Sequence, residues 1–127
     1  MIARAEILRT HAFLARRFRW RRPLVVVGID EALREAEALA AGRREDEPAA
    51  LLLALLRRPM DLGDGWERLP LVLVENLARQ LGAELRLDPR DDAVQALRMR
   101  AIARAPAERA TFDEVRAFVA ARLRRMT

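Results

Sequence analysis

The feature that most constrains the fold is a segment, residues 70–82, that is apolar on nearly every side. Pro70 suits the first turn of a helix, and Gly82 suits its end. A helix that is apolar all round has no face for solvent, so other elements must bury it. The sequence therefore predicts a central helix on which the rest of the chain packs. Its apolar positions are Leu71, Val72, Leu73, Val74, Leu77, Ala78 and Leu81.

Upstream of this segment the pattern changes several times. Residues 3–19 have apolar side chains at near-helical spacing and predict an amphipathic helix, which Pro23 stops. Residues 24–29 are short and β-branched, so they predict a strand or an extended segment. Asp30 is placed to cap a second helix over residues 31–41.

The remaining segments also carry boundary signals. Residues 43–47 are charged and predict a solvated linker, after which a third helix runs from Pro48 to about residue 58. Residues 84–87 alternate and predict a short strand. Asp88 and Pro89 predict the start of a helix that reaches about residue 105. A capping-box pattern at Thr111 opens the last helix, to about residue 124.

Length and composition are those of one globular domain over residues 1–127, because 52% of the residues are hydrophobic and 34% are charged. The predicted class is mainly α, with about six helices around the central one and one or two short extended segments. The longest apolar runs, residues 49–56 and 69–74, are too short to span a bilayer. We therefore expect a cytoplasmic protein with no membrane partner, and the oligomeric state stays open.

The chain lacks several chemically active residue types. It has no Cys, Ser, Tyr or Lys, so all 24 basic residues are Arg, and His11 is its one histidine. Nucleophilic Ser, Cys and Lys are excluded, and a general base must be His11 or a carboxylate. The Arg- and Ala-rich composition is typical of a GC-rich bacterial genome, and the single Asn76 suits a thermophile.

A loop at residues 58–68 joins two apolar helices and contains two glycines and three acidic residues. A glycine loop before a helix N-terminus can present amides to an anion. Asp61, Asp64 and Glu67 would repel a phosphate unless a divalent cation, such as Mg²⁺, lies between them. The alternative interpretation is a polar turn with glycines at positive φ.

This loop resembles the signature of the Fic/Doc family (filamentation and death-on-curing proteins), His-Pro-Phe-x-Asp/Glu-Gly-Asn-Gly/Lys-Arg. Pro59, Gly63 and Gly65 fall on that pattern, with Met60 at the Phe position and Asp64 at the Asn position. The opening helix, residues 6–18, and the C-terminal half, residues 81–118, are also similar to Doc-type members. The resemblance implies a Fic/Doc-like fold with a helix directly after the loop.

In the family the signature His is the general base, the acidic residue binds magnesium, and backbone amides and the Arg hold nucleotide phosphates. In this chain Arg58, Leu62 and Trp66 occupy the base, metal and phosphate-Arg positions. A second register with a two-residue insertion puts Asp64 at the metal position and Arg68 at the phosphate position. Neither register contains the His, and Arg cannot act as a base near neutral pH.

The resemblance therefore implies a binding or regulatory protein, a relict of a toxin–antitoxin module, that has lost nucleotide or phosphate transfer. We predict no catalytic residue and no cofactor, apart from Mg²⁺ if a nucleotide binds. A protein partner is expected. An active transferase that uses Asp61 or Asp64 as its base is a further hypothesis, and these two are the candidates for a metal. The ligand-binding candidates are Gly63, Asp64, Gly65, Trp66 and Arg68.

A second hypothesis is a basic helical module that binds nucleic acid. Five arginines interleave with Phe18 and Trp20 between residues 16 and 22, and the net charge is +5. Arginines at a helix C-terminus also complement the helix dipole, so this cluster has a purely structural interpretation as well. The nucleic-acid candidates are Arg16, Arg17, Arg19, Trp20, Arg21 and Arg22.

Overall fold

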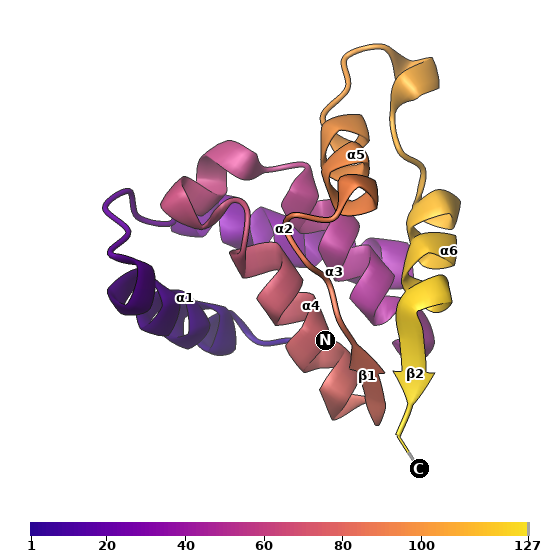
Figure 1. Cartoon of the computed structure of the whole chain (residues 1–127), viewed down its shortest axis with the longest axis horizontal. Helices are drawn as coiled ribbons and strands as arrows, with labels where there is room; N and C mark the ends of the chain where they lie inside the picture. The colour runs from indigo at the N-terminus through magenta and orange to yellow at the C-terminus, as the bar shows by residue number, and fades with distance from the viewer. Residues whose placement is uncertain (127) are drawn as a thin grey trace.

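The computed structural model describes residues 1–126, and they are mainly helical (Figure 1). Three short 3-10 segments and two short strands join the α-helices, so the predicted fold class is confirmed. The α-helices are α1 (Arg4–Phe18), α2 (Val26–Ala40), α3 (Glu47–Leu56), α4 (Leu69–Gln80), α5 (Asp92–Ala101) and α6 (Phe112–Arg122). The 3-10 segments are η1 (Arg44–Asp46), η2 (Pro59–Gly65) and η3 (Pro106–Glu108), and the strands are β1 (Ala83–Leu85) and β2 (Leu123–Arg125).

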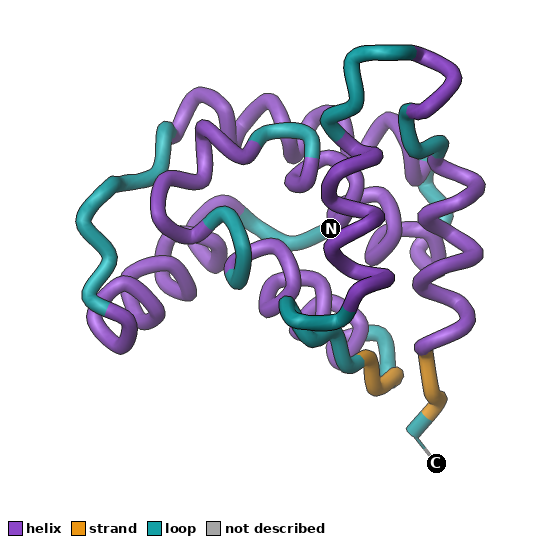
Figure 2. Tube along the Cα trace, turned by 45° about the horizontal axis from the view of Figure 1, so that its top comes forward, coloured by secondary structure: helices purple, strands orange, loops and turns teal. Residues whose placement is uncertain are grey.

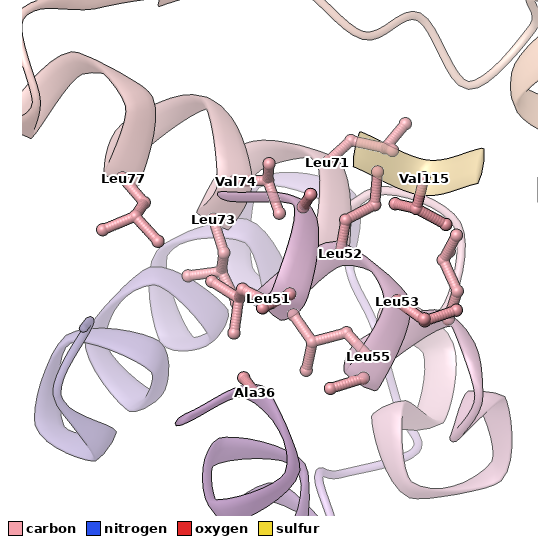
Figure 3. Close-up of a cluster of buried hydrophobic side chains, with 14 of the residues drawn as sticks. Ala36, Leu51, Leu52, Leu53, Leu55, Leu71, Leu73, Val74, Leu77 and Val115 are labelled. Carbon is pink, nitrogen blue, oxygen red and sulfur yellow. The ribbon is translucent and has the colours of Figure 1, made fainter. Parts of the chain in front are cut away.

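Helix α3 lies at the centre of the molecule, since every residue from Pro48 to Leu56 is buried. Helices α2, α4 and α6 pack around it. Figure 3 shows its leucines between Val74 of α4, Val115 of α6 and Ala36 of α2. Nine consecutive residues without a polar side chain, Pro48 to Leu56, can only be accommodated in a helix that has contacts on every side.

Helix α4 was the helix predicted to be central, and it is buried along most of its length. Leu71, Leu73 and Leu77 are buried as expected, while Leu81 lies just past the helix end and is partly exposed. One strip of α4 faces outward, at Arg79 and Gln80. The central position belongs to α3, because α4 has exposed polar residues at its C-terminal end, whereas α3 has no polar residue after Glu47.

The predicted strand at residues 24–29 is wrong, and so is the predicted cap at Asp30. Helix α2 begins at Val26, and Asp30 lies inside it, where its carboxylate pairs with the Arg4 guanidinium at 2.9 Å. Ile29 and the alanines that follow it every three or four residues are buried against the core. That helical period outweighs the β propensity of three consecutive valines.

The start of α5 was also predicted wrongly. Its cap is Asp91, whose carboxylate accepts the Ala93 N–H at 2.9 Å. Asp88 instead closes a turn by accepting the Arg90 N–H at 2.8 Å. The helix ends at Ala101, short of the predicted residue 105.

The predicted cap of α6 is confirmed, because the Thr111 hydroxyl accepts the Glu114 N–H at 3.2 Å. The helix stops at Arg122, where β2 begins and pairs antiparallel with β1 in a two-stranded sheet. The prediction of a solvated linker at residues 43–47 is wrong at Asp46, which is buried. Its carboxylate accepts hydrogen bonds from the side chains of Arg43 and Arg116. No helix within residues 1–126 is both long and apolar enough to cross a membrane.

Candidate functional site: the glycine loop and its arginine neighbours

The glycine loop folds as η2 between α3 and α4, and it lies against the connection from α1 to α2. Both segments are at the end of the molecule where that connection protrudes (Figure 1). The Val25 N–H donates to the Asp61 carbonyl at 2.9 Å, and the Asp64 N–H donates to the Arg22 carbonyl at 3.3 Å. The loop therefore contacts a segment about forty residues earlier in the chain along its length.

Asp64 fixes this contact through its carboxylate. It accepts the N–H groups of Arg21 at 2.7 Å and Arg22 at 3.0 Å, and also the Arg22 Nε at 2.8 Å. The Arg22 side chain, followed by the two backbone donors, lowers the pKa of Asp64 to about 2. A carboxylate that already accepts three hydrogen bonds is a poor ligand for a metal and a weak base near neutral pH.

The two loop glycines make room for the α1–α2 connection. Gly63 has φ 56°, and a Cβ there would lie 2.4 Å from both the Arg22 and Pro23 carbonyl oxygens. At Gly65 a Cβ would lie 3.0 Å from the Trp20 ring. The expected positive φ is found at Gly63 but not at Gly65. Residues 20–23 thus cover the side of the loop on which the two glycines lie, which we call the glycine face.

Arg58, which the resemblance would place at the position of the catalytic His, is held by α2. Its Nη1 lies 3.2 Å from Glu31 and its Nη2 lies 3.1 Å from Glu35. Arg57 also pairs with Glu35. The two arginines therefore connect the end of α3 to α2, and both guanidinium groups are engaged in ion pairs.

Asp61 approaches α2 closely through its side chain. A Cβ on Gly28 would lie 2.2 Å from the Asp61 Cγ, so Gly28 is needed where α2 crosses the loop. The two proposed metal candidates, Asp61 and Asp64, contact different parts of the α1–α2 region. Within residues 1–126, no group of three or more His, Cys, Asp or Glu side chains is arranged to hold a metal ion.

The side chains of Trp66 and Arg68 contact residues outside the glycine loop. The Arg98 guanidinium lies 5.2 Å from the Trp66 ring centre and donates to the Glu67 carbonyl at 2.8 Å, which ties the loop to α5. Arg68 instead lies over the Phe18 ring at 4.4 Å. The five predicted ligand residues therefore do not surround one site.

Arg98 is a residue that the sequence reasoning missed. It is almost fully buried, and burial lowers the pKa of its guanidinium. It lies four residues after Val94 on the buried face of α5. This spacing in the sequence could have indicated that position 98 is buried.

The arginines of residues 16–22 are exposed, and of them only Arg22 pairs with a carboxylate in the described chain. Trp20 is different. Its ring packs against Gly65 and lies 5.5 Å from the His11 ring and 6.0 Å from the Phe18 ring. His11 is partly buried beneath it, and burial lowers the pKa of the imidazole. The structure thus separates the predicted nucleic-acid residues into exposed arginines and a packed tryptophan.

Comparisons with known proteins do not identify the family of this chain. The chain matches no family model, no curated protein and no solved structure. The resemblance of the loop to the Fic/Doc signature therefore stays a prediction from the residues themselves.

Proposed function

We propose that this protein works by binding and transfers no nucleotide or phosphate group. In this proposal it is a Fic/Doc-like domain, a relict of a toxin–antitoxin module, in which the signature loop has become a structural element. The observation that carries the proposal is Arg58. At the place of the catalytic base the chain has a guanidinium, and two glutamates of α2 hold it.

The remaining groups of the loop do not replace that base. An arginine keeps its proton at any physiological pH, so Arg58 cannot accept one from a substrate hydroxyl. Asp64, with a pKa of about 2, is far from the value at which a general base is efficient near pH 7. Asp61 remains the one candidate base for the alternative hypothesis of an active transferase.

The closed glycine face supports the same proposal. An anion site at a loop needs amides that point to open space. Here the carbonyl oxygens of Arg22 and Pro23 lie against Gly63, and the Trp20 ring lies against Gly65. A nucleotide phosphate would have to displace the α1–α2 connection, together with the hydrogen bonds of Asp64.

The test is a transfer assay with labelled ATP, Mg²⁺ and a cell lysate. We expect no adenylyl or phosphoryl label above background, both for the protein and for Arg58→His, because the metal and phosphate positions also differ from the signature. Labelling by the protein that is abolished in Asp61→Asn and kept in the matched variant Asp92→Asn would establish the active transferase instead.

A second candidate function, nucleic-acid binding, is favoured by one observation. Arg16, Arg17, Arg19 and Arg21 are exposed, and no carboxylate pairs with them within residues 1–126. The packing of Trp20 leaves phosphate contacts as the main contribution, without base stacking. Such binding would be insensitive to sequence, and its log–log salt slope on duplex DNA would be about −0.9 per contact.

A further inference from the structure

The α1–α2 connection lies against the glycine loop, and the exposed residues of these two segments form one surface. Residues 18–27 run antiparallel to residues 60–68: the Arg68 guanidinium lies over the Phe18 ring at 4.4 Å, and the Val25 N–H bonds to the Asp61 carbonyl at 2.9 Å. We call this surface the basic ridge. Its exposed members are Arg16, Arg17, Phe18, Arg19, Arg21, Arg22, Pro23, Val25, Val26, Val27, Met60, Glu67 and Arg68.

The basic ridge carries a net positive charge, because its six arginines outnumber the three carboxylates of the same segments, those of Asp61, Asp64 and Glu67. Of its six arginines, only Arg22 pairs with a carboxylate, that of Asp64, among the residues described. The Arg68 guanidinium covers the Phe18 ring, and the Arg68 residue is exposed to solvent. At the first turn of α2, which holds no acidic residue of its own, the Asp61 side chain lies against Gly28 and offsets the positive end of the helix dipole.

The basic ridge is also unusually apolar for a solvent-facing surface. Of the ten large apolar residues that are exposed among residues 1–126, it contains five, including Val27 at 66% and Met60 at 82% exposure. Apolar side chains beside a cluster of cations are typical of surfaces that enter the interface of an anionic bilayer. Contacts with nucleic-acid phosphates would leave these side chains without a partner.

The shape of the basic ridge also favours contact with a lipid surface. The connection protrudes at one extreme of the molecule, seen at the left of Figures 1 and 2. A docked peptide helix needs a groove, whereas a lipid surface accepts a protruding ridge.

We propose that the basic ridge attaches the protein peripherally to anionic lipid bilayers. The arginines contact lipid phosphates, while Val26, Val27 and Met60 enter the headgroup region. This inference rests on the proposed binding role and names its partner. It goes beyond the expectation of no membrane partner, which was based on the length needed to span a bilayer and does not bear on attachment to its surface.

The experiment is co-sedimentation of the full chain with two kinds of vesicle at 0.1 M salt. One kind is phosphatidylcholine alone, and the other contains about one third phosphatidylglycerol. We expect binding to the anionic vesicles only, and weaker binding as salt increases. Absence of binding to the anionic vesicles would overturn the proposal.

Paired substitutions test which surface is used. Arg19→Gln with Arg21→Gln should weaken binding by about fivefold per arginine. Val27→Ser with Met60→Ser leaves the charge intact and should weaken binding about tenfold through lost insertion. Both apolar positions are highly exposed, so their replacement leaves the core contacts in place.

Two matched controls remove the same groups from the α5 side of the molecule. Arg90→Gln with Arg104→Gln and Met99→Ser with Ile102→Ser should bind vesicles like the unchanged protein. If either control pair loses as much as its ridge counterpart, net charge or general apolarity is responsible, and the assignment to the ridge is wrong. Submicromolar binding of duplex DNA at physiological salt, without vesicle binding, would assign the ridge to nucleic acid.

The two proposals fail separately. Labelling in the transfer assay would overturn the proposed loss of catalysis and leave the vesicle result standing. Absence of vesicle binding would remove the lipid partner and leave the proposed loss of catalysis intact.

Discussion

Helix α3 and the glycine loop follow each other in sequence, yet they are held in place by opposite means. From Pro48 to Leu56, the side chains of α3 are held in place by burial among apolar neighbours. The loop after it is stabilised by directional contacts: a carboxylate with three hydrogen bonds, and a glycine that lets two backbone segments touch. The first region tolerates changes that preserve volume, whereas the second depends on single atoms.

The largest expected effect is in α3. Leu53→Ala removes a fully buried side chain and should lower the free energy of unfolding by about 2–5 kcal/mol, measured by urea denaturation. Met60→Ala is the control, because its side chain is mostly exposed and should change stability by less than about 0.5 kcal/mol. Equal losses for the two variants would contradict the central place of α3.

The glycine loop is tested by a comparison of two glycines that both have positive φ. Gly63→Ala must strain the backbone and also press a methyl against two carbonyl oxygens, so we expect a loss of about 2–4 kcal/mol. Gly42→Ala meets only the backbone strain, about 1–2 kcal/mol, since nothing lies within 4 Å of its Cβ position. A smaller loss at Gly63 than at Gly42 in urea denaturation would show that the loop is not packed against residues 22–23.

The smallest expected effect is a pH dependence from Asp64. Its pKa is lowered from 3.8 to about 2 in the folded protein, so its ionised form is favoured by folding. The stabilisation is therefore complete above the unfolded value and is lost as pH falls through the folded value. Urea midpoints measured between pH 5 and 2 should fall less steeply for Asp64→Asn than for the unchanged protein. Identical pH profiles would show that the three hydrogen bonds to Asp64 do not form in solution.

The core could be predicted from the sequence because burial follows from periodicity. The segment at residues 70–82, the proline at the start of α3 and the Thr111 cap all depend on local pattern, and the structure has them. The start of α2 could not be predicted in this way. Three valines favour a strand locally, and only the packing of Ile29 and the alanines on α3 decides for a helix.

The candidate site was predictable as a set of residues but not as an arrangement. The glycines and Asp64 stood out in the sequence, yet their partners, Trp20, Arg22 and Pro23, are about forty residues away. Likewise, the pairing of Arg58 with Glu31 and Glu35 needs the crossing of α3 and α2. Long-range contacts of this kind leave no local pattern in one sequence.

The most direct test of the central claim, that the glycine loop is closed and structural, is an NMR titration of the backbone amides with Mg²⁺ and ATP. The closed loop predicts that the amides of residues 58–66 keep their chemical shifts up to millimolar nucleotide, because residues 20–23 already occupy their glycine face. Saturable shifts confined to those amides and to residues 20–23 would show that the loop opens to bind a phosphate, and would contradict the claim.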